Sequence, residues 1–249
     1  MNSSVIDILK RTIHTVFRMY GFDIVRVHRN APKSIVTGTF PPYQEYYSIG
    51  KVENYFIHDG YNHRSETKFF DDTENTDGWQ KEVYFFAREI FDENNLTAVC
   101  DIGCGSGYKL VNNFGGCSTI GLDVDKTCIT LKKIYPHLTW MVLDLNNPPN
   151  FRADLVIASD IIEHLLEPDK LLSYIAELNS KYILFSTVER NLLRVGTHNG
   201  PPMNPTHVRE WNFAEFDAYI SSRFEVLEHF ISNSAQATQC LLCTPRRID

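Results

Sequence analysis

The chain has 249 residues, of which 43% are hydrophobic and 22% are charged. This balance suits one sizeable α/β domain and excludes global disorder. The 24 Lys and Arg residues against 31 Asp and Glu residues give a formal net charge of -7, which argues against a protein that binds nucleic acid through phosphate contacts.

The first 30 residues predict an amphipathic helix with basic residues around it. Apolar side chains recur there at a spacing of three to four, at Val5, Leu9, Ile13, Val16 and Tyr20. We favour packing of this helix on the domain, or on the second subunit of a homodimer, over contact with an anionic membrane surface. No apolar run reaches the roughly 18–20 residues of a membrane span, and no signal peptide is evident.

Residues 31–76 are rich in Pro, Gly, Tyr and acids and have no long periodicity. We interpret them as a cap or lid, because their aromatic residues need burial or a ligand: Tyr43, Tyr46, Tyr47, Tyr55, Phe56 and Tyr61. The predicted division is an N-terminal helix and cap over 1–76 and a catalytic domain over 77–249. Asp77 is the expected N-cap of a helix that reaches Phe91.

From residue 96 the pattern alternates between strands and helices. Strands are predicted at Thr97–Ile102, Ser118–Asp123, Leu138–Leu143, Ala153–Ser159, Tyr182–Thr187, Phe224–Phe230 and Thr238–Thr244. Helices such as Lys126–Tyr135 and Asp169–Asn179 separate the earlier strands. This pattern predicts an α/β fold of the Rossmann-like class: a mainly parallel seven-stranded sheet with helices on both faces and an antiparallel C-terminal hairpin.

The six cysteines show no disulfide-framework spacing, so a reducing cytoplasm is the expected compartment. Cys240 and Cys243 have C-x-x-C spacing, but they lie in a strand-like run, where positions three apart point to opposite faces. We therefore do not expect a redox or metal role for this pair.

A glycine-rich turn follows the first predicted strand, in the run Asp101-Ile102-Gly103-Cys104-Gly105-Ser106-Gly107. Glycines allow positive φ and close approach of a ligand to the backbone, and open α/β sheets place ligands beyond the carboxyl ends of their strands. The D-x-G-x-G-x-G form differs from the dinucleotide fingerprint G-x-G-x-x-G. It resembles the first motif of class I methyltransferases that use S-adenosyl-L-methionine. The resemblance implies that this loop approaches the methionine part of the cofactor.

Two further acids end the next two predicted strands. By the same resemblance, Asp123 would accept hydrogen bonds from both ribose hydroxyls of the cofactor, and Asp144 would accept from the adenine amino group. Other residues expected to bind the cofactor lie in the glycine loop, next to these two acids, at the end of the fourth strand or in the helix from residue 77. They are Cys104, Val124, Leu145, Ser159, Gln80 and Tyr84.

Two downstream segments and an upstream region, residues 70–73 with 77–84, extend the resemblance over roughly residues 68–245. Glu163-His164-Leu165 is similar to the E-H-L segment of ubiquinone-biosynthesis O-methyltransferases, and residues 204–211 are similar to an N-P-x-H-V-R-E-W segment of bacterial glycan and small-molecule methyltransferases. The expected acceptor is therefore a hydroxyl on a small molecule or on a sugar or capsular-polysaccharide precursor. The cap and the Gly200–Pro202 loop are the expected substrate walls.

The same segments predict a catalytic or metal site. Asp160, Glu163 and His164 lie at i, i+3 and i+4, so a helix that began at Asp160 would place them on one face. Together with His207 they would form a divalent metal site, as in the RNA 2′-O-methyltransferases that carry an E-x-x-E-H segment and a later histidine. The metal-free alternative makes His207 or His164 a general base.

Four alternatives to small-molecule O-methylation stay open from the sequence. They are N-methylation of a small molecule, metal-dependent RNA 2′-O-methylation, a nicotinamide-dependent oxidoreductase and a binding module without catalysis. The acidic composition and Asp160, which is one methylene shorter than the glutamate of the RNA enzymes, weigh against the RNA substrate. The glycine spacing weighs against the nicotinamide cofactor.

Overall fold

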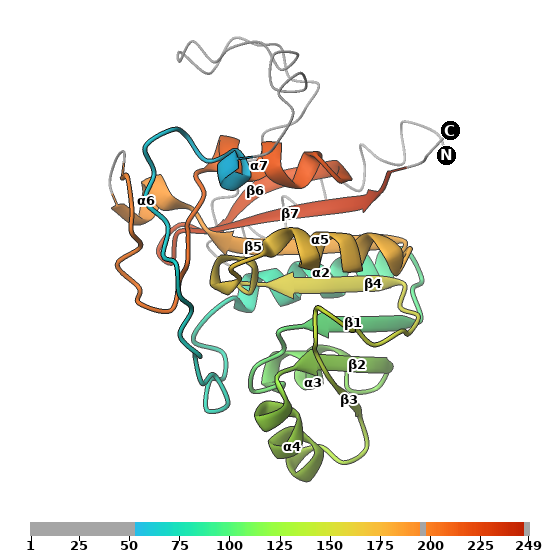
Figure 1. The fold of residues 1–249 in the computed structure, drawn as a ribbon. Helices are drawn as coiled ribbons and strands as arrows, with labels where there is room; N and C mark the ends of the chain where they lie inside the picture. The colour runs from blue at the N-terminus through green and yellow to red at the C-terminus, as the bar shows by residue number, and fades with distance from the viewer. Residues whose placement is uncertain (1–52, 195–197, 247–249) are drawn as a thin grey trace, which may run out of the picture.

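The computed structural model describes residues 53–194 and 198–246, which form a seven-stranded sheet (Figure 1). The strand order is β3-β2-β1-β4-β5-β7-β6. The first five strands pair in parallel, whereas β7 pairs antiparallel with both β5 and β6. The strands are β1 (Ala98–Ile102), β2 (Ser118–Asp123), β3 (Thr139–Val142), β4 (Leu155–Ser159), β5 (Tyr182–Val188), β6 (Phe224–Asn233) and β7 (Thr238–Pro245). The predicted fold class is confirmed, including the C-terminal hairpin at one edge.

Helices cover both faces of the sheet because neighbouring strand residues bury apolar side chains on opposite sides. Cys100 and Val156 pack on one side with α5 and α7, and Val99 and Leu155 pack on the other with α2, α3 and α4. Figure 1 shows α5 in front of the sheet and α2 behind it. The helices are η2 (Glu53–Phe56), α2 (Lys81–Glu93), α3 (Tyr108–Phe114), α4 (Asp125–Ile134), η3 (Ile162–His164), α5 (Pro168–Glu177), α6 (Arg190–Arg194) and α7 (Phe213–Ser221).

The chain order of the strands reverses between β1 and β4. After β1 the chain builds β2 and β3 on one side, and it then returns to place β4 on the other side of β1. In open α/β sheets, the helices leave in opposite directions at such a point, and a crevice forms beyond the carboxyl ends of the two strands. The glycine loop after β1 and the turn after β4 therefore flank the same crevice.

Two local predictions are wrong. The helix expected from Asp77 begins only at Lys81, and Gln80, with φ 60°, occupies the N-cap position instead. No helix begins at Asp160 either, because its φ of 48° is left-handed and the 3₁₀ turn η3 starts at Ile162. Asp160 therefore does not share a helix face with Glu163 and His164.

The predicted N-terminal helix and the cap residues Tyr43, Tyr46 and Tyr47 lie outside the described residues. In the described part of the cap, Tyr55 meets Tyr219 of α7 edge-on at 5.9 Å and Tyr61 is 5% exposed, whereas Phe69 and Phe70 are exposed. Within the residues described, no helix is long and apolar enough to cross a membrane. The division at residue 76 stays a prediction.

Gly121 in β2 provides a test of the packing behind the glycine loop. A Cβ at Gly121 would lie 2.3 Å from the Trp140 ring and 3.0 Å from the Cys104 sulfur, whereas a Cβ at exposed Gly116 would meet nothing within 4 Å. We expect Gly121→Ala to lower the free energy of unfolding by about 1–3 kcal/mol, because overpacking displaces a buried ring. Gly116→Ala is the matched control and should leave it nearly unchanged. Urea unfolding measures both, and equal stabilities would contradict this packing.

Candidate active site

A cavity of about 860 Å³ lies at the carboxyl ends of the strands on either side of the β1/β4 crevice. This volume is within the range of small-molecule and cofactor sites. Most of the predicted site residues line it: Gln80, Tyr84, Gly103, Cys104, Gly105, Asp123, Val124, Asp144, Leu145, Ser159, Asp160, Glu163, His164 and His207. Asp101 and Gly107 lie behind the lining, Asp101 being fully buried and Gly107 occupying the N-cap position of α3.

The glycine loop is approached closely from two sides. Gly103 and Gly105 have φ values of 78° and 52°. A Cβ at Gly103 would lie 2.7 Å from Ile161 in the turn after β4. A Cβ at Gly105 would lie 2.5 Å from the carboxylate of Asp72 in the cap. Only glycine combines these backbone conformations with so little space, so the loop can present its backbone directly to a ligand.

Asp101 lies beneath the loop at the end of β1. Its Oδ2 accepts a 2.7 Å hydrogen bond from the Tyr84 hydroxyl, and its buried Oδ1 has no partner among the described residues. Burial raises the pKa of Asp101 to about 7, although the Tyr84 hydrogen bond and the Lys109 ammonium lower it. An acid with an unused oxygen at this depth suits a cationic ligand group.

Asp123, at the end of β2, accepts a backbone hydrogen bond on each carboxylate oxygen. Oδ2 accepts from the Gly105 amide at 2.8 Å and Oδ1 accepts from the Val124 amide at 2.7 Å. The Thr127 side chain also hydrogen bonds to this carboxylate, and a lone pair is left for a hydroxyl donor. Burial raises the pKa of Asp123. Asp144 and the apolar Leu145 also line the cavity. This set of acids fits S-adenosyl-L-methionine, which combines ribose hydroxyls with positive charge.

Glu163, His164 and His207 form a compact cluster at the other end of the cavity. Their ligand atoms lie within 4.8 Å of one another, and the two imidazole rings meet edge-on with centroids 4.8 Å apart. Both Glu163 oxygens are buried without a hydrogen-bond partner in the described part of the chain. Burial and the Asp160 carboxylate raise the pKa of Glu163, while burial and His207 lower the pKa of His164 to about 4. Neutral imidazoles and an unsatisfied carboxylate are suitable ligands for a divalent cation.

Asp160 lines the cavity but lies outside this cluster. Its carboxylate accepts from Gln80 at 2.9 Å and from Ser186 at 2.7 Å, and Ser186 in turn contacts Ser159 at 2.7 Å. Asp160 therefore connects the start of α2 to the ends of β4 and β5. Of the four residues predicted to bind metal, the structure brings together Glu163, His164 and His207.

Hydrogen bonds join the segment that carries His207 to the turn that carries Glu163 and His164. The Val208 amide donates to the Glu163 carbonyl at 2.7 Å. The Arg209 guanidinium donates to the carbonyls of Leu165 at 2.8 Å and Leu166 at 3.0 Å. Residues 204–211 thus reach the turn after β4 although more than 40 residues separate them in the chain.

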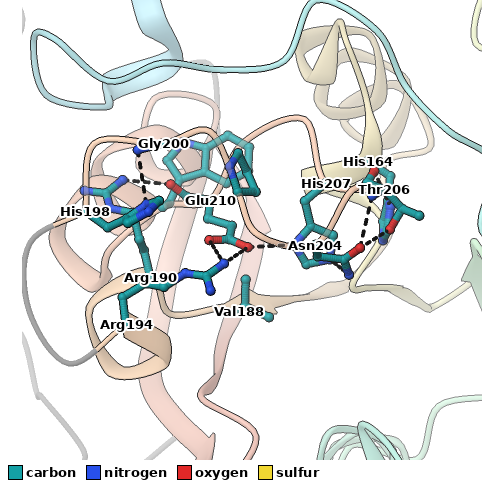
Figure 2. Close-up of polar contacts among 12 residues, drawn as sticks. His164, Val188, Arg190, Arg194, His198, Gly200, Asn204, Thr206, His207 and Glu210 are labelled. Atoms are coloured by element: carbon teal, nitrogen blue, oxygen red, sulfur yellow. Dashed lines mark hydrogen bonds and ion pairs between the residues drawn. The ribbon is translucent and has the colours of Figure 1, made fainter.

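Glu210 is a buried residue of the site that the sequence analysis missed. It contacts His207 Nδ1 at 2.9 Å and Arg194 at 3.3 Å (Figure 2). Burial alone would raise the pKa of Glu210, but the hydrogen bond from His207 and the charge of Arg194 outweigh it and lower the pKa. The H-x-x-E spacing could have indicated this pair, since it places the acid three residues after the histidine.

The walls of the cavity also differ from the expectation. Among the cap aromatics named from the sequence, Tyr55, Phe56 and Tyr61 are described and pack away from the cavity, and the loop of residues 200–207 contributes Asn204 and His207 rather than Gly200–Pro202. The aromatic residues at the cavity mouth are Phe69, Phe70 and Trp79, each more than half exposed. Phe70 and Trp79 lie in segments that resemble the N-terminal region of related methyltransferases, but the sequence did not predict their place at the cavity.

Comparisons with known proteins point to one family. A model of the methyltransferase domain matches residues 61–232. A probable S-adenosylmethionine-dependent methyltransferase of Mycolicibacterium smegmatis is 27% identical over 161 residues, which cover 60% of this chain and 62% of the relative. The ubiquinone biosynthesis O-methyltransferase of Rhodopseudomonas palustris is 32% identical over 101 residues, which cover 36% of this chain and 40% of the relative. The chain thus spans less than two thirds of the length of these curated relatives.

The fold is also similar to that of solved structures. An S-adenosylmethionine-dependent methyltransferase from Clostridium acetobutylicum superposes with a TM-score of 0.54 at 14% identity, over 67% of this chain and 92% of that chain. At this identity the similarity concerns the fold.

The position of Asp101 predicts a pH-dependent cofactor site. We expect the affinity for S-adenosylhomocysteine to fall as the pH drops through about 7, because protonation of Asp101 removes the charge that attracts the ligand ammonium. Asp101→Asn should weaken binding at pH 8 roughly 10- to 100-fold, since hydrogen bonds to charged groups contribute about 1.5–3 kcal/mol.

Calorimetric titrations from pH 5.5 to 8.5 measure this dependence, and the Asn variant should show little of it. Asp59→Asn, at an exposed site, should keep the profile of the unmodified chain. A variant at Asp101 with the unmodified profile would exclude this carboxyl as the titrating group.

Proposed function

Because this chain belongs to the family of class I S-adenosylmethionine-dependent methyltransferases, we propose that it transfers a methyl group to a hydroxyl of a small molecule or of a sugar or polysaccharide precursor. Membership confirms the predicted family and cofactor. The observation that carries the choice of a hydroxyl is the buried cluster of Glu163, His164 and His207 beside the cofactor residues.

The cofactor, when bound, would supply a methyl carbon that is electrophilic because it is bonded to a positively charged sulfur, which can leave as a neutral thioether. The chain must then position the acceptor and remove its proton. Under this proposal Asp101 attracts the ammonium group, Asp123 holds the ribose hydroxyls, and the walls of the cavity exclude water from the reacting atoms. The acids around the glycine loop also favour the positively charged ligand over a neutral one.

A hydroxyl acceptor has to lose a proton, whereas many amines do not. Glu163, His164 and His207 would either hold a divalent cation, which lowers the pKa of a bound hydroxyl, or use an imidazole as the base. The cation is supported by the two Glu163 oxygens, which are buried without a hydrogen bond of ordinary geometry in the described chain, although the Thr187 hydroxyl and the Glu163 amide lower the pKa of this carboxyl. Asp160 is not included in the proposed ligand set, because Gln80 and Ser186 occupy its carboxylate.

Further support for O-methylation comes from the similarity to the ubiquinone biosynthesis O-methyltransferase. The exposed Phe69, Phe70 and Trp79 at the cavity mouth would pack against a ring of the acceptor. All six cysteines are free, which supports a cytoplasmic location. Homodimer formation through the N-terminal segment remains part of the proposal.

The function is tested by methyl transfer from radiolabelled S-adenosylmethionine to a panel of acceptors: nucleotide sugars, phenols, amines and a short RNA. Transfer to a hydroxyl of a sugar or phenol supports the proposal. Transfer only to amines, or only to the RNA 3′ end, overturns it. A matched series with EDTA and added Mn²⁺ separates the two modes of proton removal.

His207→Ala tests the cluster directly. We expect it to abolish saturable Mn²⁺ binding measured by titration calorimetry and to lower methyl transfer at least 100-fold, because a ligand or a base is lost. The control is His137→Ala, which removes an exposed histidine on another part of the chain. Full methyl transfer by a folded His207→Ala protein would exclude both roles of His207.

A further inference from the structure

The protonation of His207 can be deduced from its two neighbours. An imidazole that is neutral carries its proton on only one nitrogen, and the groups that face each nitrogen decide which one. Figure 2 shows His207 between Glu210 on one side and Asn204 on the other. These two contacts are independent, because they involve different nitrogens of the ring.

Glu210 determines the state of Nδ1. Its Oε1 lies 2.9 Å from His207 Nδ1, and its side chain is 0% exposed. Arg194 lies 3.3 Å from Oε2 and 3.4 Å from Oε1, which supports the ionised form of the acid. An ionised carboxylate only accepts hydrogen bonds, so Nδ1 must carry the proton.

Asn204 leads to the same assignment from the other nitrogen. Its Oδ1 accepts from the Thr206 amide at 3.0 Å and from the Thr206 hydroxyl at 2.8 Å. The amide oxygen is therefore identified, and Nδ2, which only donates, faces His207 Nε2 at 2.9 Å. A donor at this position requires a lone pair on Nε2.

We propose that Glu210, held by Arg194, is a positioning residue that keeps the proton of His207 on Nδ1 and the lone pair on Nε2, where a cation or an acceptor proton would replace the hydrogen bond from Asn204. This inference rests on the proposed function of the cluster. His164 also carries its proton on Nδ1 when neutral, because its Nδ1 lies 3.0 Å from the Thr206 carbonyl, which can only accept a hydrogen bond. Histidine ligands of metals commonly donate their second N–H to a carboxylate or a carbonyl.

The proposal predicts an effect of glutamine at position 210 that a purely structural role would not produce. Glutamine has one acceptor oxygen, and the Arg194 guanidinium, which only donates, would hold it. The amide NH2 would then face His207 Nδ1 and drive the proton to Nε2, and the Asn204 amide would turn away from the ring. Removing Arg194 as well would release the glutamine oxygen to accept from Nδ1 and restore the first tautomer.

The experiment uses the full chain, free of metal and labelled with ¹⁵N-histidine, in two-bond ¹H–¹⁵N correlation spectra at pH 8. The His207 signals are identified by their loss in His207→Ala. We expect the Nδ1–H tautomer in the unmodified chain and in Arg194→Met, the Nε2–H tautomer in Glu210→Gln, and return to Nδ1–H in the double variant Glu210→Gln/Arg194→Met. Mn²⁺ binding should weaken about 10- to 100-fold in Glu210→Gln and recover in the double variant.

An Nε2–H signal for His207 in the unmodified chain overturns the proposal without any variant, and so does a folded Glu210→Gln protein that keeps Nδ1–H. If the unmodified chain shows Nδ1–H and Glu210→Gln switches it, the proposal stands even where no Mn²⁺ binds. In that case the cation of the proposed function is excluded, and the Nε2 lone pair of His207 would act as the base that takes the proton of the acceptor.

Discussion

The hydrogen bonds that Val208 and Arg209 make to the carbonyls of residues 163, 165 and 166 hold the site together. The Arg209 guanidinium also lies over the Tyr55 ring at 4.2 Å, so one side chain joins the described cap, the turn after β4 and the segment before α7. Carbonyls in an irregular turn need partners when they are buried, and here the partners come from the segment that carries His207. The conformation of the turn and the position of the histidine therefore depend on the same hydrogen bonds.

Buried carboxylate oxygens without a hydrogen-bond partner lie at both ends of the cavity. One oxygen of Asp101 and both oxygens of Glu163 are buried without partners in the described chain. Such groups destabilise the free protein, because burial removes water and offers no replacement hydrogen bond. Strongly shifted carboxyl groups in a cavity are typical of functional sites. A positively charged cofactor at one end and a cation at the other would each relieve one of these groups.

The polar chain from Arg194 through Glu210 to His207 runs along the cavity wall, with Arg194 and His207 in the lining and Glu210 buried between them. Arg190 supports it from behind, since it donates to the Glu210 carbonyl at 2.7 Å and pairs with Glu215 at the capping box of α7. The imidazole is thus oriented by groups that never reach the cavity centre. A rigid support of this kind keeps a reacting group in its productive geometry.

The sequence alone determined the sheet, the glycine loop and the acids at the strand ends, because each depends on neighbouring residues. Apolar runs predict buried strands, and the D-x-G-x-G-x-G spacing places the loop at the end of β1 whatever the rest of the chain does. The tertiary structure decided which residues meet. Asp160 left the predicted ligand set because its backbone turns left-handed and its carboxylate binds Gln80 and Ser186. Glu210 joined the site through two contacts. The H-x-x-E spacing indicates the one with His207, whereas the one with Arg194 joins separate segments and leaves no local pattern in the chain.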